Sequence, residues 1–102
     1  MATKTRKLRP IHPGQVLKTV LDDAGISANA LALALRIPAN RLTEIIKGRR
    51  SISADTALRL RRYFGTSAQM WMNLQAKYDL DSAEDTLADR IETEVQPMRK
   101  AS

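Results

Sequence analysis

The stretch from Ser27 to Arg50 constrains the fold of this chain more than any other part, because its apolar residues recur at helical spacing. Ser27 stands where its hydroxyl would cap the first turn of a helix. The apolar stripes of two successive short helices are Leu31, Ala32 and Leu35, followed by Leu42, Ile45 and Ile46. The sequence therefore predicts two short amphipathic helices joined by a tight turn.

The turn between the two helices and the outer face of the second helix indicate the function of this helix pair. Ala32 is small where two helices would cross closely, and Pro38 suits the first turn of a helix, where a missing N–H costs nothing. Gly48 provides a left-handed stop, and two arginines follow it. Polar residues point outward or lie on the flank: Asn40, Arg41, Thr43, Glu44 and Lys47. This pattern is typical of a helix-turn-helix, whose second helix enters the DNA major groove. The alternative is a helical hairpin with a solvated outer face.

The charge of the chain is unevenly distributed along its 102 residues, with a net charge of +6. Residues 1–18 hold five basic residues and no acid, and residues 36–63 hold eight basic residues against Glu44 and Asp55. Residues 77–102 reverse this balance, with seven acids against four bases. The basic part overlaps the predicted helix pair, as phosphate recognition requires, whereas the acidic end would be repelled from DNA.

Composition excludes several classes of protein. The chain has no cysteine, and a single histidine, His12, cannot form a metal site alone, so we expect no metal and no cofactor. His12 with Pro13 more plausibly sets the start of a helix than takes part in catalysis. No glycine-rich loop or paired carboxylates indicate an enzyme. The longest strongly apolar run, residues 30–35, is too short to span a membrane, and no secretory signal is evident. We therefore expect a bacterial cytoplasmic protein, at the nucleoid when bound to DNA.

The remaining segments predict an all-α chain in three parts. Residues 1–9 form a flexible basic arm, residues 10–80 a helical domain, and residues 81–102 an acidic amphipathic helix and tail. Helices are expected over residues 13–24, 54–64 and 68–79 in addition to the central pair. A last helix is expected to begin after Ser82, with Asp85 in a capping box, and to end before Pro97.

Residues 70–91 carry more apolar side chains than one small core can cover. Trp71 and Leu74 suit the core, and the surplus is expected to pack on a second copy or on another protein. The candidate interface residues are Met70, Met72, Tyr78, Leu87 and Ile91.

Three strings within Pro10 to Leu80 resemble a known family: IHPGQVL, GISANALALAL and IPANRLTEIIKGRRSISADTALRLRRYFGTSAQMWMNLQAKYDL. They are similar to the HigA/VapI group of antitoxins within the Xre-like helix-turn-helix repressors. The resemblance implies a five-helix, phage-repressor-like domain, to which this chain adds a C-terminal helix. It also implies a homodimer that represses its own operon by binding double-stranded operator DNA. The other implied partner is a toxin resembling the ribonuclease HigB.

The resemblance also assigns roles to residues. Those expected to face bases are Ala39, Asn40, Arg41 and Thr43, and those expected to face phosphates are Ser27, Lys47, Arg49 and Arg50. Glu44 is expected to brace Arg41 and Lys47, although it could also accept a hydrogen bond from cytosine. Two departures from the family pattern stand out. Arg36 occupies a turn position that usually holds a left-handed glycine, so we expect either about 1 kcal/mol of strain there or a shifted turn. Arg61 falls within the apolar arc of the fourth helix, so its side chain must extend outward or pair at an interface.

The main hypothesis is a dimeric repressor that also neutralises a toxin. Two alternatives remain open: a toxin-binding module without DNA binding, and a stand-alone transcription regulator without a toxin. The acidic segment from Asp79 to Glu94, with its stripe of Leu87, Ile91 and Val95, is expected to contact a basic toxin. The alternative for this segment is that it packs on the domain or completes the dimer.

Overall fold

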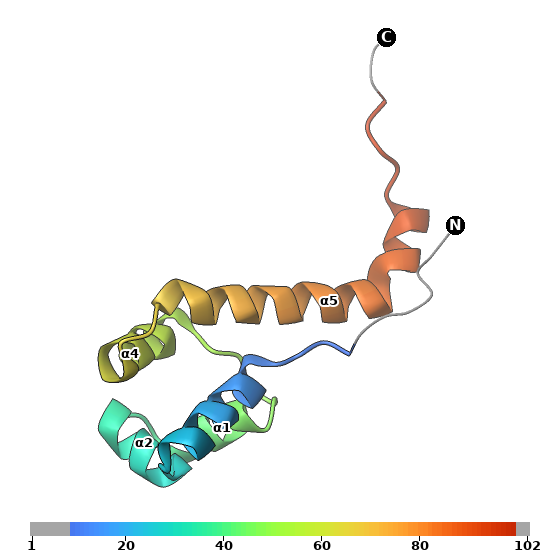
Figure 1. Cartoon of the computed structure of the whole chain (residues 1–102). Coiled ribbons are helices and arrows are strands. Elements are labelled where there is room, and N and C mark those ends of the chain that lie inside the picture. Colours follow the sequence, from blue (N-terminus) through green and yellow to red (C-terminus); the bar gives the residue numbers. More distant parts are fainter. Residues whose placement is uncertain (1–8, 100–102) are drawn as a thin grey trace.

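The computed structural model describes residues 9–99 and confirms an all-α chain (Figure 1). The five helices are α1 (Pro13–Ala24), α2 (Ala28–Leu35), α3 (Ala39–Ile46), α4 (Ala54–Phe64) and α5 (Ala68–Glu94). Of the predicted basic arm, residues 1–8 lie outside the described residues, and Arg9 is exposed. Within residues 9–99 no helix combines the length and the apolar composition needed to cross a membrane.

Local capping signals set where four of the helices begin. The side chains of Ser27, Ser53 and Ser67 each accept a hydrogen bond from a backbone N–H in the first turn of the helix that follows. His12 caps α1 in the same way, because its Nδ1 accepts a hydrogen bond from the N–H of Gly14 at 2.8 Å. These bonds satisfy N–H groups that have no partner within the helix. The predicted role of His12 in starting a helix is confirmed.

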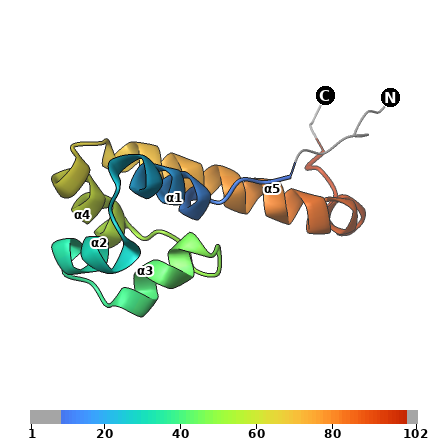
Figure 2. The same cartoon turned by 60° about the horizontal axis from the view of Figure 1, so that its bottom comes forward.

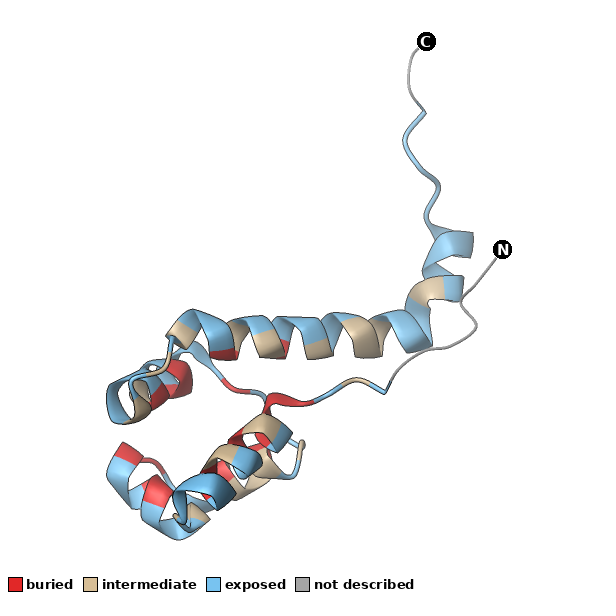
Figure 3. Cartoon of the chain, viewed as in Figure 1, coloured by how far each residue is buried: buried red, intermediate tan, exposed pale blue. Residues whose placement is uncertain are grey.

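The four shorter helices form a bundle at one end of the molecule, and α5 crosses it and extends well beyond it (Figure 2). α5 packs on α1 and α4, while α3 packs on α1 and α2. The buried positions face the space between these helices (Figure 3). The apolar core consists of Leu17, Leu21, Leu31, Ala32, Leu35, Ile37, Leu42, Ile45, Ile52, Ala57, Leu60 and Trp71.

The C-terminal part of the chain differs from the prediction. Instead of two helices with a break near Ser82, α5 continues unbroken over 27 residues. The predicted capping box at Ser82 and Asp85 is therefore wrong: Ser82 lies inside the helix, and its carbonyl accepts a hydrogen bond from Thr86 Oγ1 at 3.3 Å. No glycine or proline interrupts residues 68–94, so the helical hydrogen-bond ladder overrides the local capping signal.

Candidate nucleic-acid interface

The turn between α2 and α3 has the geometry of a tight left-handed connection. Arg36 adopts φ 60° and ψ 44°, and it is the single residue other than glycine with a positive φ among the described residues. This conformation costs an L-residue about 1–2 kcal/mol, so the expected strain is present. The buried side chain of Ile37 and a 3.1 Å hydrogen bond from its N–H to the Ala32 carbonyl hold the turn. Pro38 occupies the N-cap position immediately before α3, without a capping side-chain hydrogen bond, rather than the first turn, which corrects the predicted position by one residue.

α3 presents a polar face to solvent because its apolar residues are committed to the core. Leu42 and Ile45 are fully buried, whereas Ala39, Asn40 and Lys47 are exposed. Neither Asn40 nor Lys47 has a side-chain partner in the described part of the chain. Both are therefore free to donate to an external acceptor.

Thr43 lies one turn after Ala39 on α3 and is partly buried. Its Oγ1 donates a hydrogen bond to the Ala39 carbonyl at 3.0 Å. Because its hydrogen is used within the helix, the hydroxyl can serve a base edge only as an acceptor. Thr43 also lines a cleft of about 290 Å³ together with Ser27 and Lys47. The structure thus brings one predicted base-contacting residue and two predicted phosphate-contacting residues to a single surface.

The N-terminus of α2 suits phosphate binding at the edge of that surface. Ser27 is exposed, and its oxygen accepts the cap hydrogen bond from Ala30 at 3.0 Å, which leaves its hydroxyl hydrogen available. Unpaired N–H groups and the helix dipole favour an anion at such a terminus.

The loop after α3 carries the other basic residues. Gly48 adopts φ 77°, as predicted for a left-handed stop, and Arg49 and Arg50 follow it in exposed positions. Glu44 Oε2 lies 3.4 Å from Arg49 Nη1, so the carboxylate braces Arg49. The prediction that Glu44 braces Arg41 and Lys47 is wrong, because after the left-handed residue Gly48 the N–H of Arg49 donates to the Glu44 carbonyl at 2.8 Å and brings Arg49 beside the carboxylate.

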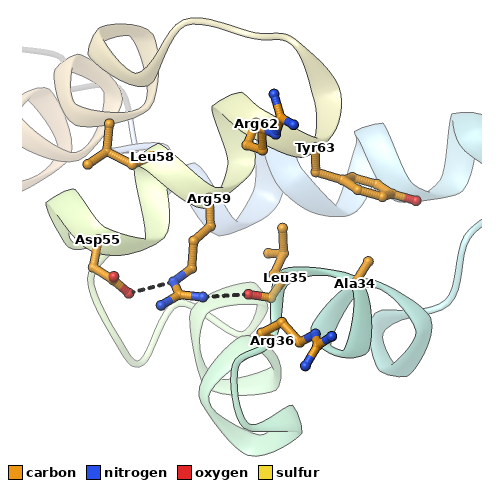
Figure 4. A pocket seen from close by; sticks show the side chains of 8 residues that line it. All are labelled: Ala34, Leu35, Arg36, Asp55, Leu58, Arg59, Arg62 and Tyr63. Carbon is orange, nitrogen blue, oxygen red and sulfur yellow. Dashed lines mark hydrogen bonds and ion pairs between the residues drawn. The ribbon is translucent and has the colours of Figure 1, made fainter.

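Arg41 is directed toward α4 rather than straight outward. Its Nη1 lies 3.6 Å from Asp55 Oδ2, and about a third of its side chain is exposed. Asp55 also accepts a hydrogen bond from Arg59 Nε at 3.0 Å, and Arg59 Nη1 donates to the Leu35 carbonyl at 2.9 Å (Figure 4). A cleft of about 550 Å³ lies beside this group, between the end of α2 and α4.

The arginines of α4 differ in burial. Arg61 is exposed, as expected for a residue that must extend out of the apolar arc or pair at an interface, whereas Arg59, for which no role was predicted, is partly buried. The spacing of Asp55 and Arg59 by four residues was a visible signal for a pair on one helix. The contact with Arg41 joins residues 14 positions apart in different helices, so no local pattern revealed it.

Contacts with α5 and with the segment before α1 hold the loop that carries Arg49 and Arg50. Gln75 is buried, and its Oε1 accepts a hydrogen bond from the N–H of Ile52 at 2.7 Å. The His12 ring packs edge to face on Tyr78, with ring centroids 4.7 Å apart. Burial lowers the pKa of His12 below its ordinary value of 6.5, and the charge of Asp79 and a hydrogen bond to the Arg50 backbone oppose this only in part. No local sequence pattern marked Gln75, because its partner Ile52 lies 23 residues away in the chain.

The candidate interface residues on α5 fall into two groups. Met72 is partly buried against the core and Tyr78 is partly buried beside His12, so both contribute to the fold of one copy. Met70, Leu87 and Ile91 are exposed by 37%, 39% and 48%. Trp71 is fully buried, as expected, and its Nε1 donates to Thr66 Oγ1 at 2.9 Å.

Two short helices joined by a left-handed turn, with the second held by its apolar face and flanked by basic residues, define a helix-turn-helix DNA-binding protein. The helix-turn-helix family model matches residues 17–71, more than half of the chain. The chain is also 53% identical over 75 residues to virulence-associated protein I of Dichelobacter nodosus, covering 72% of this chain and 69% of that protein.

Solved structures show the same relationship. A HigA-family addiction module antidote protein from Coxiella burnetii is 49% identical, with a TM-score of 0.83, covering 89% of this chain and all of that one. The antitoxin HigA of Pseudomonas aeruginosa, solved with the higBA promoter, is 48% identical, with a TM-score of 0.85 and the same coverage. The chain belongs to the HigA/VapI group of antitoxins within the Xre-like helix-turn-helix family.

Proposed function

We propose that this protein is a sequence-specific DNA-binding repressor that also serves as the antitoxin of a toxin–antitoxin pair. The observation that supports this most is the placement of α3: its apolar face is buried, and Asn40 and Lys47 project from it without partners in the described chain. A helix of eight residues presented in this way fits the major groove. A family of DNA-binding regulators and antitoxins also gives no reason to expect an enzyme.

The surface divides into residues that read sequence and residues that hold the backbone. We infer that Ala39, Asn40, Arg41 and Thr43 face base edges, where an asparagine suits adenine, an arginine suits guanine and an alanine methyl can contact thymine. Phosphate contacts come from both sides of α3. They are assigned to Ser27, Lys47, Arg49 and Arg50. These contacts fix position but carry no sequence information.

A homodimer fits the size of the interface. One helix-turn-helix contacts few base pairs, and a two-fold dimer reads two half-sites about 34 Å apart or a multiple of that. Exposed Met70, in the part of α5 before residue 80, provides apolar surface for such a contact. Light scattering at micromolar concentration should give the mass of a dimer, and a monomer mass alone would count against this part of the proposal.

We assign toxin binding to the C-terminal end of α5. Beyond the bundle this helix exposes Leu80, Leu87 and Ile91 beside several carboxylates. A ribonuclease needs positive charge where it holds RNA, so the two surfaces are electrostatically complementary. Because its partners would be DNA and such a toxin, we infer that the protein resides in the bacterial cytoplasm, and at the nucleoid when it is bound to DNA.

The experiment compares binding to two duplexes in fluorescence anisotropy: the promoter region upstream of the gene for this chain, and a shuffled duplex of the same composition. The promoter duplex should bind at least about 10³-fold more tightly. Binding to both should weaken with salt, because phosphate contacts release counterions. Equal affinities for the two duplexes would contradict a sequence-specific repressor.

A further inference from the structure

A series of polar contacts links the end of α2 through α4 to α3, and the proposed function gives this series no role. Arg59 Nη1 donates to the Leu35 carbonyl at 2.9 Å, and its Nε donates to Asp55 Oδ2 at 3.0 Å. The same carboxylate oxygen lies 3.6 Å from Arg41 Nη1. The Asp55–Arg59 pair of α4 thus contacts α2 through Arg59 and α3 through Asp55.

Contacts other than the one with Arg41 hold Arg59 and Asp55 in place. The Leu35 carbonyl belongs to the last residue of α2, where carbonyls lack partners within the helix, and Arg59 supplies one. Asp55 stands in the first turn of α4, where the helix dipole favours its negative charge. Figure 4 shows Arg59 extended between the two, with its guanidinium between Asp55 and the Leu35 carbonyl. Asp55 is therefore held in place before any ligand arrives.

The arrangement leaves Arg41 able to act on DNA. A guanidinium has five N–H donors, and the contact with Asp55 involves one of its terminal nitrogens. One carboxylate faces two guanidinium groups, so the cluster keeps a net positive charge and is not repelled by phosphate. An unsupported arginine side chain would lose rotamer entropy on being fixed in the groove. Support from Asp55 reduces that loss at the moment of binding.

We propose that Asp55 is a positioning residue for operator recognition: held by Arg59, it orients Arg41 toward one base pair and so controls selectivity at that position. This inference rests on the proposed function. Asp55 need not touch a base; it acts through Arg41. Its removal would free Arg41 to reach neighbouring phosphates, which favours binding to any DNA sequence.

The test measures affinities for the promoter duplex and the shuffled duplex with five variants of the full chain: three single variants at Asp55 and Asp81, and then Arg41→Ala alone and combined with Asp55→Asn. Asp55→Asn removes the charge at nearly constant size and should lower the ratio of the two affinities about tenfold, equivalent to ~1.4 kcal/mol. Its affinity for the shuffled duplex should rise. Asp55→Glu keeps the carboxylate and should retain most of the selectivity. Asp81→Asn is the matched control, because Asp81 forms a similar exposed pair with Lys77 at 3.0 Å on α5, away from α3; its selectivity should be unchanged.

A double variant separates positioning from a merely structural role. In an Arg41→Ala background, Asp55→Asn should change the selectivity ratio by less than about twofold, because the residue through which it acts is gone. A full tenfold effect in that background would overturn the proposal. A parallel loss of affinity for both duplexes together with a lowered Tm for Asp55→Asn would also overturn the proposal, because it would mark a fold defect.

The outcomes distinguish this inference from the proposed function. If the unaltered chain fails to distinguish the duplexes, the proposed function and this inference both fail. If the unaltered chain distinguishes them and Asp55→Asn does so equally well, this inference alone fails.

Discussion

Gln75 on α5 holds the loop that carries the basic residues, because its Oε1 accepts a hydrogen bond from the N–H of Ile52 at 2.7 Å. Both residues are buried, with exposed fractions of 5% and 1%. The other end of the amide is also used, since Gln75 Nε2 donates to Asp79 Oδ1 at 2.9 Å. The position of the loop after α3 therefore depends on a helix that begins more than 15 residues later in the chain.

Replacing Gln75 by leucine should destabilise the fold, because the Ile52 N–H stays buried and loses its acceptor. An unsatisfied buried donor costs about 1–3 kcal/mol. The measurement is the free energy of unfolding from chemical denaturation. Gln69→Leu on the same helix is the control, since Gln69 is exposed and its amide pairs only with Asn73. Equal losses for the two variants would show that the buried hydrogen bond contributes little.

Gly14→Ala should be among the most damaging single-methyl additions in the chain. A Cβ at Gly14 would overlap the carbonyl oxygen of Ile45 and lie 2.8 Å from its carbonyl carbon, so α1 and the end of α3 would have to separate. Overpacking against backbone of this kind costs about 3 kcal/mol. Gly65→Ala is the control: it has a positive φ of 79° and open space around it, and should cost only about 1 kcal/mol. Thermal unfolding of both variants measures the difference, and a Gly14→Ala cost no larger than that of the control would rule out the close contact.

The free energy of unfolding should fall as the pH is lowered from about 7 to about 5, partly because of His12. Burial holds the pKa of His12 below 6.5 in the folded chain, so the unfolded chain binds more protons in this range. The contribution is therefore fully present above pH 6.5 and is lost as the pH falls through the folded value. His12→Asn keeps a helix-capping oxygen but does not titrate, and should flatten the pH dependence. An unchanged slope in this variant would assign the effect to other groups.

Asn40→Ala and Arg49→Ala should affect DNA binding differently. Loss of a base contact at Asn40 should cost about 1–3 kcal/mol on the promoter duplex and little on a shuffled one. Arg49→Ala should weaken binding to both duplexes about equally and reduce the salt dependence by about one counterion, because a phosphate contact carries no sequence information. Anisotropy titrations at several salt concentrations measure both effects. A selective loss for Arg49→Ala would place that residue on a base.

A chain ending at Leu80 tests the role assigned to the far end of α5. The buried core ends at Gln75, so the helical bundle should remain folded and should still bind the promoter duplex. Affinity for the proposed toxin should fall, because the exposed apolar residues and carboxylates beyond residue 80 are gone. Co-purification and circular dichroism measure binding and helix content. Full neutralisation of the toxin by the shortened chain would move the contact to the bundle.

The helices could be predicted where their signals are local. His12, Ser27, Ser53 and Ser67 mark helix starts, because a capping side chain bonds to N–H groups only two or three residues away. The same reasoning failed at Ser82, where the capping pattern is also local but the helical ladder of α5 had no reason to break. A cap determines a helix start only when the preceding residues leave the helix.

The sequence by itself determined the all-α fold and the polar outer face of α3, because helical periodicity acts over a few residues. The left-handed turn at Arg36 was implied by the resemblance to the family, since arginine itself does not favour that conformation. The Glu44–Arg49 pair is also local, because the left-handed residue Gly48 turns the chain so that Arg49 lies against Glu44. The tertiary structure decided which distant groups meet: Arg41 faces Asp55, and Gln75 accepts a hydrogen bond from Ile52. These two pairs depend on how segments far apart in the chain pack, and spacing along the chain does not encode that packing.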